Sequence, residues 1–302
     1  MLKKVKLDSV KLDDVRSGIG RLFKRVGLVP HRRPPYLTRD WRWHYRPDAR
    51  AVARLGPDLS SPTIWSANPE AAAPDGELAQ IFLSTPNLQK WMQYLPIYEH
   101  VLTGLRNRRI LFLEIGVDRG GSLEAWRRYL GPEATIVGVD INPTCAAFDD
   151  PSTATYVRIG SQDDAGFLGS VVEEFGAFDV ILDDGSHFTS HQIASFRFLF
   201  PHGVAPGGRY LVEDLQTNYW RHYRDSARSF IDMAKDLVDV ANSQYQDETM
   251  LERDFRIGSE WRRMNVRVPL AARLVESIEF HDGIVVINKA LESRNLPGSF
   301  MT

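Results

Sequence analysis

Two groups of acidic residues, each at the end of an apolar run, are the part of this sequence best suited to carry chemistry. The segment FDVILDDGSH ends an apolar run in Asp183 and Asp184 and continues to His187, and GGRYLVEDL ends in Glu213 and Asp214. Such runs are typical of buried parallel strands, whose carboxyl ends meet at one edge of a sheet. If the two strands are neighbours, four carboxylates converge there and require a neutralising cation.

The composition of this acidic group predicts a hard divalent cation. Oxygen ligands without a thiolate select Mg²⁺, Mn²⁺ or Ca²⁺ over zinc. We take Asp184, Glu213 and Asp214 as the candidate metal ligands and expect Asp183, the last residue of its apolar strand, to support a cofactor. The alternative is that Asp183 or Asp184 only caps the helix that follows.

An imidazole beside such a cation is suited to remove a proton from a hydroxyl group. A metal lowers the pKa of the hydroxyl that it coordinates, and an imidazole that titrates near neutrality can accept the proton. His187, three residues after Asp184, is therefore the candidate general base. His191, one helical turn later, is the competing base, and a plain surface position for His187 is the alternative without function.

A second group of residues is placed to bind a nucleotide. In LFLEIGVDRGGSL a strand ends at Glu114 and Gly116, and Gly120 and Ser122 stand where a helix begins, so backbone N–H groups can approach a ligand closely. The spacing differs from G-x-G-x-x-G and favours S-adenosylmethionine over NAD. Asp140, at the end of the next strand, is placed to accept hydrogen bonds from both ribose hydroxyls.

The elements that must position these residues alternate between strand and helix from about Arg109 onward. Near-continuous apolar strands between amphipathic helices predict a parallel sheet covered on both faces. The C-terminal run VESIEFHDGIVVINKA is typical of a hairpin that turns at HDG. We therefore predict an α/β fold of the Rossmann-like class I methyltransferase type, a mostly parallel seven-stranded sheet with a C-terminal antiparallel hairpin.

The sequence divides into three regions, which are a basic N-terminal segment (1–50), a Pro/Ala/Ser-rich connector (51–85) and the predicted methyltransferase domain (86–302). The first region holds fourteen Lys and Arg against five Asp and Glu, whereas the rest holds 23 against 34. Its IGRLFKRVGLV stretch predicts a basic amphipathic helix that packs on the main domain or at a subunit interface, with peripheral contact to an anionic membrane as the alternative. We expect no nucleic acid partner, since the acidic remainder would repel phosphates.

The composition also bounds the compartment. A chain with 43% hydrophobic and 25% charged residues is globular, and the single cysteine, Cys145, excludes an internal disulfide and fits a reducing compartment. No apolar run is long enough for a membrane span, and acidic residues interrupt the N-terminus where a signal peptide needs an apolar stretch. We expect a cytoplasmic protein that forms a homo-oligomer.

These motifs together resemble a known family. The run from KWMQYLPIYEHVL through LFLEIGVDRGGSL and DVILDDGSHFTSHQ to GGRYLVEDLQTNYW is similar to the metal-dependent sugar O-methyltransferases of class I. That group includes the mycinamicin and demethylmacrocin O-methyltransferases and, more distantly, the cephalosporin hydroxylase-like proteins. The likeness covers about residues 86 to 290 and rests on DDGSH, the Glu-Asp pair and T-x-Y-W in that order.

The resemblance implies a Mg²⁺ held by the same three carboxylates, a general base at the same histidine, and S-adenosylmethionine as methyl donor. Ser161 stands where the family commonly has Asp, so the resemblance assigns the adenine contact to Gln162.

We therefore predict the Mg²⁺-dependent transfer of a methyl group from S-adenosylmethionine to a hydroxyl of a glycoside or activated deoxysugar, in natural-product or surface-glycan biosynthesis. Tyr219 and Trp220 follow the second acidic pair and could stack on the sugar ring. Two alternatives stay open. One is a catechol or phenol O-methyltransferase with the same metal chemistry, and the other is a non-catalytic S-adenosylmethionine-binding scaffold anchored through residues 1–50.

Overall fold

The structure, a computed structural model, describes residues 52–61, 63–64, 75–245 and 266–295. The basic segment 1–50, with its predicted helix and membrane contact, lies outside these residues. Within the described ranges, no helix combines the length and the apolar character that crossing a membrane requires.

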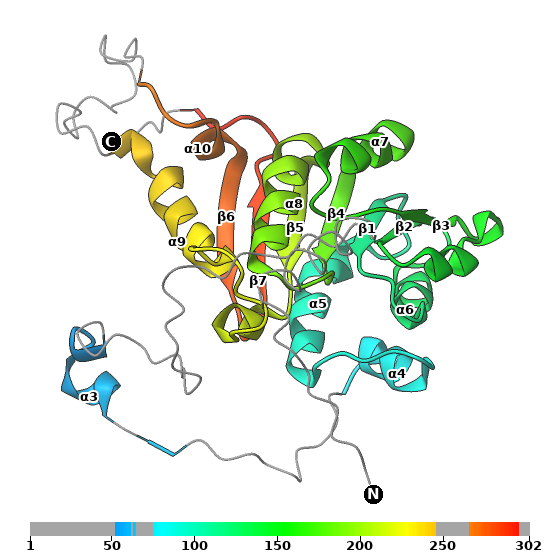
Figure 1. The fold of residues 1–302 in the computed structure, drawn as a ribbon, viewed down its shortest axis with the longest axis horizontal. Coiled ribbons are helices and arrows are strands. Elements are labelled where there is room, and N and C mark those ends of the chain that lie inside the picture. Colours follow the sequence, from blue (N-terminus) through cyan, green and yellow to red (C-terminus); the bar gives the residue numbers. More distant parts are fainter. Residues whose placement is uncertain (1–51, 62, 65–74, 246–265, 296–302) are drawn as a thin grey trace, which may run out of the picture. The chain divides into compact units, whose positions relative to one another are not determined.

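A seven-stranded sheet in the order β3-β2-β1-β4-β5-β7-β6 forms the centre of the described domain (Figure 1). Its strands are β1 (Leu111–Ile115), β2 (Thr135–Asp140), β3 (Thr155–Ile159), β4 (Phe178–Asp183), β5 (Val204–Val212), β6 (Val275–Phe280) and β7 (Val285–Lys289). The first five strands pair in parallel, and β7 is antiparallel to both β5 and β6. The predicted mostly parallel sheet with a C-terminal antiparallel hairpin is confirmed, and β4 and β5 are neighbours.

Helices cover both faces of this sheet (Figure 1). The described α-helices are α3 (Gly56–Ser60), α4 (Glu77–Ser84), α5 (Leu95–Leu102), α6 (Gly121–Leu130), α7 (Ala165–Phe175), α8 (Thr189–His202), α9 (Phe230–Ala241) and α10 (Leu270–Leu274). Short 3₁₀ helices are η1 (Met92–Tyr94), η2 (Thr103–Leu105), η3 (Pro143–Phe148), η4 (Pro151–Thr153), η5 (Leu215–Tyr219) and η6 (Ser243–Tyr245).

The strand residues alternate between two apolar cores because successive side chains of a strand point to opposite faces. Val180 and Leu182 of β4 join the core under α4, α5 and α6, whereas Ile181 joins the core under α7, α8 and α9. All three side chains are buried, as the apolar run before Asp183 predicts. This double cover fixes the end of β4, and with it the position of the acidic residues that follow.

The packed domain begins earlier than the predicted boundary at residue 86. Helix α4, inside the segment that we expected to be mostly a connector, buries Leu78 and Phe82. The ring of Phe82 meets the edge of Trp126 in α6, with 5.1 Å between the ring centroids. This aromatic contact places α4 in the core under α6.

Gly116, directly after β1, lets the chain pass very close to the loop that follows β4. Its φ is +100°, and a Cβ atom there would lie 2.1 Å from the backbone oxygen of Asp184. The amide of Asp184 in turn donates to the carbonyl of Ile115 at 2.9 Å. Only glycine combines this backbone conformation with this approach.

We predict that Gly116→Ala destabilises the fold by about 3 kcal/mol or more, because the added methyl group meets backbone and the φ is strained. Gly104→Ala is the matched control, since a Cβ atom at Gly104 meets no atom within 4 Å. Urea unfolding followed by circular dichroism measures both. Equal stability of the two variants would show that the close approach at Gly116 is not needed.

Candidate active site

The two acidic strand ends lie side by side at the carboxyl edge of the sheet. Asp183 of β4 pairs with Val212 of β5, and the amide of Glu213 donates to the carbonyl of Asp183 at 3.1 Å. Asp184, Glu213 and Asp214 therefore leave the sheet at one place, as the sequence predicts. Neither Asp183 nor Asp184 caps α8, because that helix begins at Thr189 without a side-chain cap.

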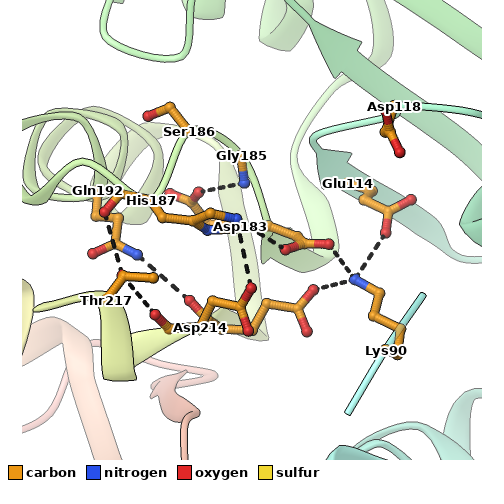
Figure 2. A network of polar contacts seen from close by, with 12 residues as sticks. Lys90, Glu114, Asp118, Asp183, Gly185, Ser186, His187, Gln192, Asp214 and Thr217 are labelled. Atoms are coloured by element: carbon orange, nitrogen blue, oxygen red, sulfur yellow. Dashed lines mark hydrogen bonds and ion pairs between the residues drawn. The ribbon is translucent and has the colours of Figure 1, made fainter. Parts of the chain in front are cut away.

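His187 lies between two of these carboxylates. Its Nε2 is 3.5 Å from Oδ2 of Asp214 and 3.9 Å from Oδ1 of Asp184 (Figure 2). Ligand atoms of the three residues all lie within 4.8 Å of one another, the one such group of three among the described residues. Each of these side chains is partly exposed, so a small ligand can reach the group.

The backbone at this group is strained, and one imidazole nitrogen has no partner. His187 and Asp214 have φ values of +59° and +56°, in the left-handed region that non-glycine residues rarely adopt. Nδ1 of His187 is buried without a hydrogen bond, while the Tyr223 ring packs against the imidazole at a centroid distance of 6.0 Å. Strain and unpaired polar atoms of this kind are common at functional sites.

Glu213, the third predicted metal ligand, faces away from this group toward a buried lysine and a tyrosine. The ammonium of Lys90 donates to one of its carboxylate oxygens and the hydroxyl of Tyr98 to the other. Burial, followed by repulsion from Asp184, raises the pKa of Glu213, and Lys90 opposes that increase. Burial alone would lower the pKa of Lys90, but the surrounding carboxylates raise it well above its ordinary value, so Lys90 carries its charge.

Asp214 has one oxygen bound and one directed at His187. Its Oδ1 accepts hydrogen bonds from the hydroxyl of Tyr94 at 2.8 Å and from Nε2 of Gln216 at 2.9 Å. Oδ2 of Asp214 and Oδ1 of Asp184 both approach Nε2 of His187. Two carboxylate oxygens in this position fit a hard divalent cation that fills its other positions with water or substrate oxygen.

Lys90, Tyr94 and Tyr98 were not among the predicted site residues. They recur every fourth residue in KWMQYLPIY, which is the spacing of one helical face. This spacing indicates that the three side chains lie on one face. It does not indicate their partners, since Glu213 and Asp214, which the two tyrosines contact, are more than 110 residues later in the chain.

A cavity of about 180 Å³ opens beside the carboxyl ends of β1 and β2. Two of the predicted cofactor residues, Asp140 and Gln162, line it, as does His191. The carboxylate of Asp140 also accepts the backbone N–H groups of Val117 at 2.8 Å and Asp118 at 3.1 Å, and thereby shapes the turn after β1. The cavity thus lies at the sheet edge where open α/β folds bind ligands.

His191, the competing base, is held on the side of this cavity. Its Nδ1 is 2.8 Å from the hydroxyl of Ser186, and its Nε2 is 3.4 Å from Oδ2 of Asp163. It is absent from the group formed by Asp184, His187 and Asp214. The geometry therefore favours His187 for a proton transfer at the acidic group.

Asp183 lies behind the cavity rather than in it. Its buried carboxylate accepts hydrogen bonds from Nε2 of Gln162 at 3.0 Å, the hydroxyl of Ser195 at 2.6 Å and the hydroxyl of Tyr210 at 3.0 Å. Oε1 of Gln162 accepts the amide of Ser186 at 2.7 Å. Asp183 therefore fixes the side chain of Gln162 and with it one wall of the cavity.

Glu114 and Ser122, predicted to bind the cofactor, contact each other under α6. The buried carboxylate of Glu114 accepts hydrogen bonds from the hydroxyl of Ser122 at 2.7 Å and from Nε1 of Trp126 at 3.1 Å. Gly116 lies two residues after Glu114, and Gly120 precedes α6 with a φ of +76°. Glu114 and Ser122 thus join β1 to the start of α6 and shape the turn from inside.

The two predicted substrate residues lie at the end of η5, next to the acidic group. The side chain of Trp220 is 48% exposed, so much of its ring is open to a ligand. Its ring lies 6.2 Å from that of Tyr223, which is the residue that packs on His187. Tyr219 is half-buried beside it.

Sequence comparison finds O-methyltransferases among the proteins similar to this chain. No family model matches the chain. The sequence is 41% identical over 162 residues to the 8-demethyl-8-(2-methoxy-alpha-L-rhamnosyl)-tetracenomycin-C 3'-O-methyltransferase of Streptomyces olivaceus, over 49% of this chain and 40% of that enzyme. It is 32% identical over 254 residues to the Mycinamicin VI 2''-O-methyltransferase of Micromonospora griseorubida, over 74% of this chain and 59% of that enzyme.

A solved methyltransferase structure also has this fold. The MycE methyltransferase from the mycinamycin biosynthetic pathway, in complex with Mg, SAH and mycinamycin VI, superposes with a TM-score of 0.60 at 25% identity. The comparison covers 75% of this chain and 56% of that one. The described domain is thus a class I methyltransferase fold. The chain is similar to several sugar O-methyltransferases, as its motifs predict, and spans about half the length of the curated relatives that it matches.

We predict that Glu114→Gln changes how stability depends on pH. Burial is the largest cause that raises the pKa of Glu114 from 4.5 to about 7. Because the folded state then keeps a proton that the unfolded chain has lost, the free energy of unfolding of the wild type falls as the pH rises from about 4.5 to 7. The free energy of unfolding of Glu114→Gln does not contain this pH-dependent loss. Between pH 4.5 and 7 the wild type is therefore expected to lose on the order of 3 kcal/mol more than the variant.

Guanidinium unfolding at several pH values, with a chelator present, measures this difference. Parallel pH profiles for the wild type and the variant would contradict the assignment of a raised pKa to Glu114.

Proposed function

We propose that this chain transfers a methyl group from S-adenosylmethionine to a hydroxyl of a sugar in a glycoside, with the help of Mg²⁺. The observation that carries the proposal is the position of Nε2 of His187 between Asp184 and Asp214, beside the cavity at the carboxyl ends of β1 and β2. The relatives support the acceptor class, since the names of two of them describe methylation of rhamnosyl-tetracenomycin compounds.

S-adenosylmethionine would supply the methyl group, and Mg²⁺ would lower the pKa of the acceptor hydroxyl. Asp184 and Asp214 offer the carboxylate oxygens that would hold the ion. His187 would accept the hydroxyl proton at Nε2. The sequence also predicts Glu213 as a ligand. Both of its oxygens accept hydrogen bonds here, one from Lys90 and one from Tyr98, so its role as a ligand stays a prediction.

The nucleoside part of S-adenosylmethionine would occupy the cavity lined by Asp140 and Gln162. Asp140 is placed at the end of β2, where an acid can accept ribose hydroxyls, and Gln162 is held in one orientation by Asp183. Gly116 and Gly120 would let the turn before α6 approach the remainder of the cofactor. Glu114 and Ser122 would shape that turn from inside.

The acceptor sugar would lie on the opposite side of His187 from this cavity. The exposed ring of Trp220, with Tyr219 beside it, offers a surface for stacking on a sugar. For the whole protein we propose a cytoplasmic location, in keeping with the single cysteine, and a homo-oligomeric state. Sedimentation velocity of the full chain tests the oligomer.

We predict that His187→Ala lowers kcat for a rhamnoside acceptor by at least about 10²-fold and leaves the affinity for S-adenosylhomocysteine unchanged, because only proton removal is lost. His191→Ala is the matched control. Since His191 lines the cavity and lies outside the acidic group, its removal is expected to weaken cofactor binding more than it lowers kcat. Product formation and calorimetry give the two readouts.

A larger loss of kcat in His191→Ala than in His187→Ala, at equal cofactor affinity, would assign the base to His191. A catechol methylated faster than any glycoside, with little dependence on His187, would favour the phenol O-methyltransferase instead, because a phenol is already acidic.

A further inference from the structure

A lysine ammonium already lies within the carboxylate cluster. Nζ of Lys90 donates to Oδ2 of Asp184 and Oε1 of Glu213, and it is 3.7 Å from Oε1 of Glu114 (Figure 2). The Lys90 side chain is only 6% exposed, and both glutamates are fully buried. One positive charge thus lies among three carboxyl groups, in a region where water screens it little.

The partners of each oxygen show what a divalent cation would meet. Both oxygens of Glu213 and Oδ2 of Asp184 are already bound, two of the three by Lys90. For Asp184 to offer both oxygens, or for Glu213 to offer one, the ammonium must leave. A cation at Asp184 would also be repelled by the ammonium on the same carboxylate.

The position of Lys90 in the chain allows such a movement. It precedes η1 in a stretch without regular structure, whereas Asp184 and Glu213 directly follow buried strands. The next residue, Trp91, is 51% exposed, so this stretch lies at the surface, although the side chains of Lys90 and Leu88 point inward. The flexible four-carbon side chain of lysine can reach another position without displacing the strands.

We propose that Lys90 is an internal counter-ion that a divalent cation displaces from Asp184 and Glu213. In the cation-free protein the ammonium neutralises the buried carboxylates, and its departure completes the ligand set that the sequence predicts. Lys90 is therefore a positioning residue that sets cation affinity. This inference rests on the proposed function, because it requires that a divalent cation binds at Asp184.

Calorimetric titration of Mg²⁺ into the metal-free full-length protein tests the proposal. Lys90→Gln is expected to bind Mg²⁺ at least about tenfold more tightly than the wild type, because a competing charge is removed. Lys289→Gln is the matched control. Lys289 is also a mostly buried lysine, but it donates to the carbonyls of Pro201 and Val204, and it is expected to leave Mg²⁺ affinity unchanged.

Equal or weaker Mg²⁺ binding by Lys90→Gln would overturn the proposal and show that Lys90 supports the site without competing for it. If neither protein binds Mg²⁺, the proposed metal dependence fails and the inference fails with it. If the wild type binds and only the gain is missing, the inference alone is overturned.

A second pair of variants serves if Lys90→Gln does not fold with Glu213 unpaired. Glu213→Gln and the double variant Lys90→Gln/Glu213→Gln both lack the buried Glu213 charge and differ only in the ammonium. The double variant is expected to bind Mg²⁺ several-fold more tightly, since Asp184 has lost its competing partner. Equal affinities would overturn the proposal.

Discussion

The site depends on the parallel pairing of β4 with β5, which forces carboxylates from two distant segments to one edge of the sheet. Asp184 and Glu213 each directly follow a buried strand, so neither can move away from the other without disturbing the sheet. Like charges held this close are costly unless positive charge or hydrogen bonds neutralise them. Much of the surrounding structure neutralises these charges.

The two sides of the Asp184–Glu213 pair differ in how the charge is neutralised. On the side of β1, Lys90 and Tyr98 bind the deeply buried Glu213, and water is excluded. On the side of α8, Asp214 and His187 adopt left-handed backbone conformations and stay partly exposed. The buried side is thus neutralised by the protein itself, whereas the open side keeps oxygens and an imidazole nitrogen available to ligands.

The fold and the open half of the site could be predicted because they depend on local patterns. Apolar runs that end in acids give strands with polar carboxyl ends, and the usual strand order makes β4 and β5 neighbours. Asp184, His187 and Asp214 follow from this placement alone. The structure brings the three together as the sequence indicates.

The buried half could not be predicted in the same way, because it depends on contacts between distant segments. Nothing near Lys90 in the sequence shows that its ammonium reaches Glu213, more than 120 residues later. The pairing of Glu114 with Ser122 also depends on the angle at which α6 leaves the turn, which the residue spacing leaves open. The sequence therefore predicts which residues stand at a strand end, but only the structure shows which partners their side chains contact.

The proposed function requires that Asp184 belongs to a site that binds both a divalent cation and S-adenosylhomocysteine, the product of the methyl donor. Calorimetry of both ligands with the wild type and Asp184→Asn measures this, with Asp236→Asn as an exposed control. We expect the wild type and the control to bind both ligands, and Asp184→Asn to keep S-adenosylhomocysteine and lose Mg²⁺. Wild-type protein that binds neither ligand, or Asp184→Asn that binds Mg²⁺ as the wild type does, would show that Asp184 is not part of such a site.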